Sequence, residues 1–154
     1  MGRDTQTMRS IFRLLLKEVA WAPFAVIVGH WLFADIFGHE PYVDPIMHFL
    51  GGAAAAYFLR RLAELSPAMV GRPSKLGHDL LAFGLCCVAA LIWEFGELAS
   101  DIFLGTNIQR SAPNTLRDLA LGASGGFAVL LLLRALRRSS REDRNASGDG
   151  IPNA

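Results

Sequence analysis

Hydrophobic residues along this chain gather in four long blocks separated by short polar segments. Each block approaches or exceeds the roughly 20 residues that an α-helix needs to cross about 30 Å of hydrocarbon. The blocks are Ala20 to Phe37, Ile46 to Leu65, Leu80 to Leu104 and Leu116 to Leu136. The pattern predicts an all-α integral membrane protein, a four-helix bundle with helices over about 11–37, 44–65, 77–104 and 114–137.

A soluble four-helix bundle is the alternative, but its helices would carry charged residues along one whole face. Residues 49–59 and 81–93 contain no charged side chain, so a water-facing side is missing. Of the 154 residues, 52% are hydrophobic, which is high for a soluble protein of one domain. We expect one membrane domain over 1–138, followed by a polar, disordered tail over 139–154.

Lys and Arg are distributed unevenly among the segments that join the predicted helices. The N-terminal segment, the second loop and the C-terminal tail are rich in them, whereas the first loop, 38–43, has none. The third loop and its flank contain only Arg110 and Arg117. The positive-inside rule then places both termini in the cytoplasm. The net charge of +1 conceals this asymmetry, which indicates topology rather than nucleic-acid binding.

Three carboxylates, Glu94, Glu97 and Asp101, fall within an arc of about 60° on the third helix. Carboxylates at membrane depth are costly and usually face a partner, a metal ion or a water-filled cavity. Asp44 and His48 share a face at the start of the second helix, and Asp118 lies one turn into the fourth. We therefore expect one polar layer that faces the outer side.

Small residues continue two of these polar faces toward the inner side of the membrane. Such residues let membrane helices approach closely, so we expect the second and fourth helices to pack inside the bundle. The glycines permit a homo-oligomer but do not require one. The two stripes are Gly51, Gly52 and Ala55 on the second helix, and Gly122, Gly125 and Gly126 on the fourth.

Carboxylates and an imidazole on facing helices are typical of metal sites built inside bundles. Several carboxylates this close cannot all remain ionised unless a cation or shared protons compensate them. A divalent metal ion is therefore one candidate cofactor, and proton sharing is the alternative. The metal-ligand candidates are Asp44, His48, Glu94, Glu97, Asp101 and Asp118, and the catalytic candidates are His48, Glu94 and Glu97.

The order of these residues resembles VanZ-like and YjdF-like small bacterial membrane proteins over roughly residues 40–130. Asp44 to Phe49 is similar to the Asp-x-x-x-His-Phe opening of that group, and residues 94–126 are similar to its second half. VanZ-like proteins often carry Asn four residues after the last Asp; Gly122 stands there, which favours the YjdF-like group. The resemblance implies a bacterial inner-membrane protein and adds Gln109 to the site. Asn114, one turn above Asp118, is a further site candidate.

Two classes of function follow from this pattern. The first is a membrane enzyme that acts on a lipid or cell-wall precursor at the outer leaflet, by metal-assisted or acid–base chemistry. The second is a non-catalytic cell-envelope protein in which the polar layer is a structural network. A small transporter is the less favoured third class, because four helices leave little room for alternating access.

Overall fold

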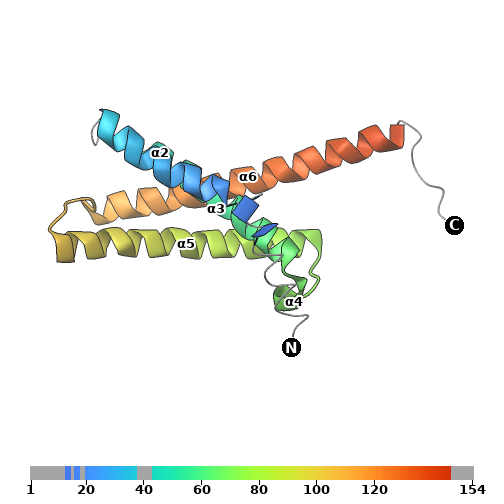
Figure 1. The fold of residues 1–154 in the computed structure, drawn as a ribbon, viewed down its shortest axis with the longest axis horizontal. Helices are drawn as coiled ribbons and strands as arrows, with labels where there is room; N and C mark the ends of the chain where they lie inside the picture. The colour runs from blue at the N-terminus through green and yellow to red at the C-terminus, as the bar shows by residue number, and fades with distance from the viewer. Residues whose placement is uncertain (1–12, 15, 18–19, 38–42, 147–154) are drawn as a thin grey trace.

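The computed structural model describes residues 13–14, 16–17, 20–37 and 43–146 of the chain (Figure 1). Its regular elements are all helices, which confirms the predicted all-α class. They are α2 (Trp21–Phe37), α3 (Val43–Leu65), the short α4 (Pro67–Val70), α5 (Lys75–Leu104) and α6 (Ala112–Ala146).

The predicted first helix, 11–37, is interrupted. Residues 13–14 and 16–17 are helical, Ala20 lies in a turn, and α2 begins at Trp21. Pro23 explains the position of this start, because proline has no backbone N–H to donate and is best tolerated in the first turn of a helix. The predicted first loop lies almost entirely outside the described residues.

α3 is the helix against which α2, α5 and α6 all pack. The glycine stripes permit this, because a Cβ atom on Gly52 would lie 1.9 Å from the carbonyl oxygen of Gly122. A Cβ atom on Gly125 would lie 1.9 Å from the carbonyl oxygen of Phe49. The backbones of α3 and α6 are thus in direct contact, and the predicted close packing is confirmed at Gly52 and Gly125.

The surface of the bundle is strongly apolar. Large side chains such as Phe95, Phe103 and Leu116 are more than half exposed, and α5 and residues 112–140 of α6 are long and apolar enough to cross a membrane. Extended apolar surface of this kind is typical of a protein that meets lipid or a partner. That four helices span the bilayer stays a prediction.

A buried ionic network joins three helices at the end of the bundle where α3 ends and α5 begins. Arg60, only 3% exposed, donates to Asp79 at 2.5 Å and to Glu64 at 2.7 Å. From α6, Arg134 pairs with Asp79 at 2.8 Å and Arg137 with Glu64 at 3.0 Å. These five residues form the Arg60 network, which fixes α5 and α6 against α3.

The C-terminal part of α6 differs from the expectation. We expected residues 139–154 to form a disordered tail, but α6 continues to Ala146 and its last turns extend beyond the other helices (Figure 1). The helix is supported there by an Arg138–Glu142 pair at 3.2 Å, four residues apart, and by the Ser140 hydroxyl bonded to the Leu136 carbonyl. Residues 147–154 lie outside the described part of the chain.

Candidate functional site

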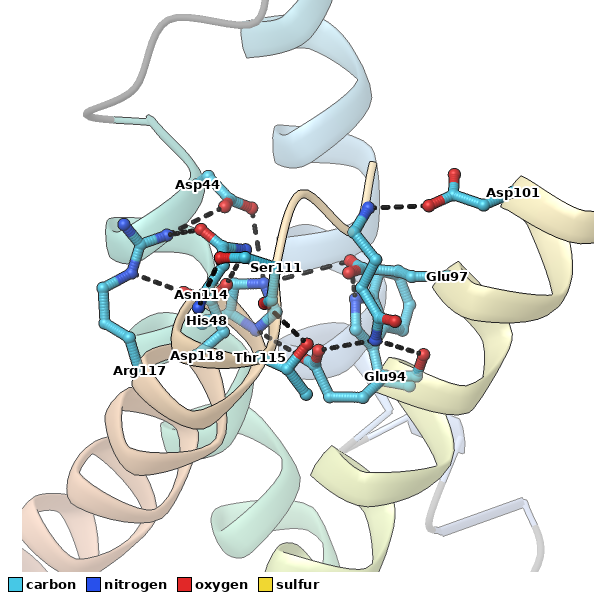
Figure 2. A network of polar contacts seen from close by, with 12 residues as sticks. Asp44, His48, Glu94, Glu97, Asp101, Ser111, Asn114, Thr115, Arg117 and Asp118 are labelled. Atoms are coloured by element: carbon cyan, nitrogen blue, oxygen red, sulfur yellow. Dashed lines mark hydrogen bonds and ion pairs between the residues drawn. The ribbon is translucent and has the colours of Figure 1, made fainter. Parts of the chain in front are cut away.

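Side chains from α3, α5 and α6 converge at the opposite end of the bundle from the Arg60 network (Figure 2). Asp44 and His48 are one turn apart on α3, and Glu94 and Glu97 are one turn apart on α5. Asp118 reaches them from α6. These five residues, which the sequence predicted to share one layer, form what we call the His48 cluster.

His48 is the centre of the cluster because its two ring nitrogens face different carboxylates. Nε2 lies 3.3 Å from Asp44 Oδ1 and 3.9 Å from Glu97 Oε1. Nδ1 lies 3.6 Å from Glu94 Oε1. If the neutral ring carries its proton on Nε2, toward Asp44, the lone pair on Nδ1 is directed toward Glu94.

Glu94 is almost completely buried, at 2% exposure. Gln109 approaches it from the α5–α6 loop, and its Nε2 donates to the Glu94 carbonyl at 3.1 Å and to Oε2 at 3.3 Å. The other carboxylate oxygen, Oε1, has no hydrogen-bond partner among the described residues. Buried polar atoms rarely lack a partner, so this oxygen requires an explanation.

Asp118 stands in contrast to Glu94, although it is equally buried. Its Oδ1 accepts a hydrogen bond from Arg117 Nε at 2.9 Å, and its Oδ2 accepts one from Asn114 Nδ2 at 2.7 Å. Arg117 also donates to Asp44 at 3.3 Å, which ties α6 to α3. Asp44 and Asp118 are therefore compensated by a guanidinium, whereas Glu94 is not.

Two sets of three ligand atoms lie within 4.8 Å of one another and have the chemistry to hold a metal ion. One set is Asp44, His48 and Asp118, and the other is His48, Glu94 and Glu97. In the second set, Trp93 orients Glu97 through a hydrogen bond of 2.8 Å from Nε1 to Oε1. The second set is the better candidate, because it contains the buried oxygen without a donor.

Asp101, which we expected among the metal ligands, is not brought into either set. It lies at the edge of the cluster and organises the loop between α5 and α6 (Figure 2). Its carboxylate accepts hydrogen bonds from the Thr106 hydroxyl at 2.6 Å and from the backbone N–H groups of Ile108 and Gln109 at 2.8 Å each. Asp101 thus holds Gln109, which in turn contacts Glu94.

Replacement of Asp101 by alanine should loosen this loop without removing a residue of the cluster. The variant loses three hydrogen bonds from this loop to a charged acceptor, so amide exchange there should become roughly tenfold faster or more. Hydrogen exchange at Ile108 and Gln109 measures this change. Arg110→Gln, at an exposed position of the same loop, is the control and should leave both rates unaltered. Equal exchange in the two variants would contradict the role assigned to Asp101.

An apolar cavity of about 200 Å³ adjoins the cluster between α2, α3 and α5. Val26 and Ile27 of α2 line it, opposite Ala89 and Trp93 of α5. His48 belongs to both the cavity wall and the His48 cluster. The polar site therefore opens onto apolar space rather than ending in packed side chains.

Sequence reasoning missed two features of this site. Arg117 was counted only as a loop charge, although its spacing of three residues from Asn114 and its position next to Asp118 are a usable signal on a helix. The cavity had no signal in the sequence, since it arises from how α2 sits on α3. Gln109 and Asn114, both named in advance as site candidates, lie in the hydrogen-bond network.

Comparison with known proteins gives one match. The family described as "Predicted membrane protein (DUF2238)" matches residues 9–139, which is most of the chain. No curated protein and no solved structure matches it. The match covers every helix that contributes to the His48 cluster, the cavity and the Arg60 network.

Proposed function

The chain belongs to the DUF2238 family of predicted membrane proteins, and we propose that it binds one divalent metal ion between His48, Glu94 and Glu97. We further propose that this site acts on a lipid or cell-envelope precursor at the outer face of the bacterial inner membrane. Both termini then lie in the cytoplasm, as the distribution of Lys and Arg predicts.

One observation carries the metal proposal: Glu94 Oε1 and His48 Nδ1 face each other across 3.6 Å with no donor between them. Two lone pairs in this arrangement repel unless a cation or a proton lies between them. Ligands at about 2.0–2.1 Å from a tetrahedral ion lie roughly 3.3 Å apart, so the observed gap is close to that of a metal centre. A direct hydrogen bond would be shorter.

The charge of the cluster supports the same proposal. Its four carboxylates, Asp44, Glu94, Glu97 and Asp118, face one guanidinium and one imidazole. With His48 neutral, as a metal ligand must be, full ionisation would leave a net charge of about −3 in a site of low dielectric, which is unfavourable. A divalent cation compensates most of that charge, and a ligand set with one imidazole suits first-row ions such as Zn²⁺ or Mn²⁺.

The residues around these ligands fit the roles that metal sites need. Asp44 Oδ1, 3.3 Å from His48 Nε2, is placed to accept its proton, as carboxylates do for metal-bound histidines, and would thereby direct Nδ1 toward Glu94. Gln109 and Trp93 orient Glu94 and Glu97. A bound ion supplies Lewis-acid polarisation of a substrate oxygen, and Glu97, beside the cavity residue Trp93, is placed to act as a general base.

The resemblance to VanZ-like and YjdF-like proteins supports an envelope role, since it covers the residues that build the cluster. It supplies no reaction, so the enzyme proposal rests on the site itself.

A structural network is the second candidate function, and one specific observation favours it. Arg117 satisfies Asp118 and Asp44 together, so part of the cluster stabilises the α3–α6 contact without any ion. In this alternative Glu94 is protonated rather than metal-bound. The two candidates differ in what the protein binds and in the effect of neutralising Glu94.

Metal content separates the two candidates. Purified protein incubated with Zn²⁺ or Mn²⁺ and then desalted should retain about one ion per chain, and Glu94→Gln and His48→Ala should retain almost none. Asp44→Asn should weaken affinity by about 10- to 100-fold, because it alters the partner of a ligand rather than a ligand. Glu142→Gln, an exposed carboxylate on the far part of α6, is the matched control and should bind as the wild type does.

Thermal stability gives a second test, because removal of the ion should reverse the order in which the wild type and Glu94→Gln melt. When the ion is present, Glu94→Gln should melt below the wild type, because the wild type gains stability from binding. After chelation the order should reverse, since the glutamine removes a buried carboxylate that lacks a donor. Equally low metal in wild type and variants, with Glu94→Gln the more stable in every condition, would refute the metal site and favour the structural network.

A further inference from the structure

The cavity beside His48 suits an apolar ligand. Its walls come from four helices and consist mainly of aliphatic, small and aromatic residues, with His48 at the side that faces the cluster. Apolar cavities do not hold water well, whereas an apolar cavity of about 150 Å³ is large enough to bind benzene. At about 200 Å³ this cavity is larger, so it suits a segment of one hydrocarbon chain and is too small for two.

The cavity exists because small residues line it at positions where larger side chains would fill it. Gly51 and Ala55 of α3 and Ala89 and Ala90 of α5 all line the cavity. A Cβ atom on Gly51 would meet only Val26, at 3.8 Å, which is ordinary contact. Gly51 is therefore not required by close packing, and its missing side chain leaves open volume.

The cavity is only partly enclosed. α2 packs against α3 but has no close backbone contact with α5 among the described residues, although both helices line the cavity. The side between α2 and α5 is therefore where we expect a lipid chain of the surrounding bilayer to enter.

His48 connects the apolar cavity to the charged cluster. A chain in the cavity places the head of its lipid at His48, within reach of the site where Glu94 and Glu97 would hold a cation. The cluster alone is acidic and repels a phosphate, whereas a bound divalent ion would compensate most of that charge and could accept a phosphate oxygen as a ligand. Charge complementarity thus selects a phosphate-bearing head when the ion is present.

We propose that the cavity binds one acyl chain of a membrane phospholipid and that the phosphate of this lipid lies at His48 against the bound ion. This inference rests on the proposed metal site for the phosphate, but the chain is bound by the cavity alone. It names the substrate class of the site: a lipid phosphate ester presented from within the bilayer.

Photolabelling tests the position of the chain. The protein is reconstituted into nanodiscs that contain phosphatidylglycerol with a diazirine at the middle of one acyl chain, and adducts are mapped by mass spectrometry. Adducts at Val26, Ala55 and Ala89 report the cavity, and adducts on the exposed side of α5 report bulk lipid. We expect strong cavity labelling that Ala89→Phe lowers about tenfold, because excluding two methylene groups has an effect of this size. Val88→Phe, on the exposed side of α5, is the control and should leave the ratio of cavity adducts to bulk-lipid adducts unaltered.

Competition experiments on the wild-type protein test the position of the phosphate. They do not depend on the folding of a variant. With Mn²⁺ present, decyl phosphate should suppress cavity labelling at a concentration about tenfold lower than decanol does. After chelation this preference should vanish, while decanol still competes.

The outcomes distinguish this inference from the proposed metal site, because metal content is measured on the same samples. Cavity labelling that Ala89→Phe leaves unaltered, in protein that retains its ion, overturns the lipid inference and leaves the metal site standing. Cavity labelling in protein that binds no ion overturns the metal site and, with it, the placement of the phosphate. Equal potency of decyl phosphate and decanol in metal-loaded protein also overturns that placement.

Discussion

Gly125→Ala in α6 is expected to disrupt the bundle strongly, as is Gly52→Ala in α3, whose Cβ atom would also lie 1.9 Å from a backbone oxygen. In Gly125→Ala the new Cβ atom would lie 1.9 Å from the carbonyl oxygen of Phe49 and 2.8 Å from its carbonyl carbon. Both are backbone atoms of a packed helix, so the clash is relieved only if α3 and α6 move apart. Overpacking against flexible side chains costs about 1–3 kcal/mol, and a backbone clash should exceed that range.

Unfolding in mixed micelles with increasing dodecyl sulfate measures this loss, followed by circular dichroism and by size-exclusion chromatography. Gly84→Ala in α5 is the matched control, because its Cβ atom would meet no atom within 4 Å. Alanine is the better helix former, so this control should be as stable as the wild type or up to about 1 kcal/mol more stable. Equal stabilities for the two variants would show that α3 and α6 are farther apart than the structure places them.

The same interface also determines the geometry of the His48 cluster. Arg117 of α6 donates to Asp44 of α3, and Asp44 holds the ring of His48. Separation of α3 and α6 would break these contacts although no proposed metal ligand has been replaced. Gly125→Ala is therefore also expected to weaken metal binding, even though it lies about two turns along α6 from Asp118.

The polar layer could be predicted from the sequence because the spacing of residues along a helix gives both their depth in the membrane and the helical face on which they lie. Glu94 and Glu97 stand out inside an apolar helix, and the interval of four residues places Asp44 over His48. The glycine stripes then indicated which helices would pack closely enough to bring these groups together. Each of these steps uses only helix geometry and the cost of polar groups in lipid.

The role of Asp101 could not be predicted in the same way. It shares a helical face with Glu94, so periodicity places it in the cluster, but its oxygens instead accept hydrogen bonds from the Thr106 hydroxyl and the backbone N–H groups of Ile108 and Gln109. Loop conformation is not encoded in a helical period. The cavity escaped prediction for a related reason, since it depends on α2 packing against α3 and not against α5.

The C-terminal end of α6 could not be predicted for a different reason. A segment of mixed charge with no apolar period was expected to be disordered, yet α6 continues through it to Ala146. Local pairs such as Arg138–Glu142 support a helix without any core, and a helix that is already formed extends at little cost because nucleation has been completed.

Arg60→Met is also expected to lower stability strongly, because it leaves an acid without its buried partner. Arg60 donates to Asp79 and to Glu64 and is only 3% exposed, and Asp79 is 6% exposed. Removing one member of a buried ion pair typically costs about 3–5 kcal/mol, since the remaining charge is no longer compensated. Arg134 still contacts Asp79, which places the expected loss near the lower end of that range. Thermal unfolding in nanodiscs measures it.

The double variant Arg60→Met/Asp79→Leu separates the cost of an orphaned charge from the value of the pair itself. Replacing both partners with apolar residues of similar size is often neutral or stabilising, so the second substitution should restore most of the lost stability. Glu64 keeps Arg61 and Arg137 as partners, and Arg134, which is 48% exposed, can be solvated. A double variant as unstable as the sum of the two single variants would mean that the Arg60 network is needed for the fold itself. In that case the α3–α5–α6 contact would depend on specific ionic bonds, rather than on apolar packing and the close approach of glycines.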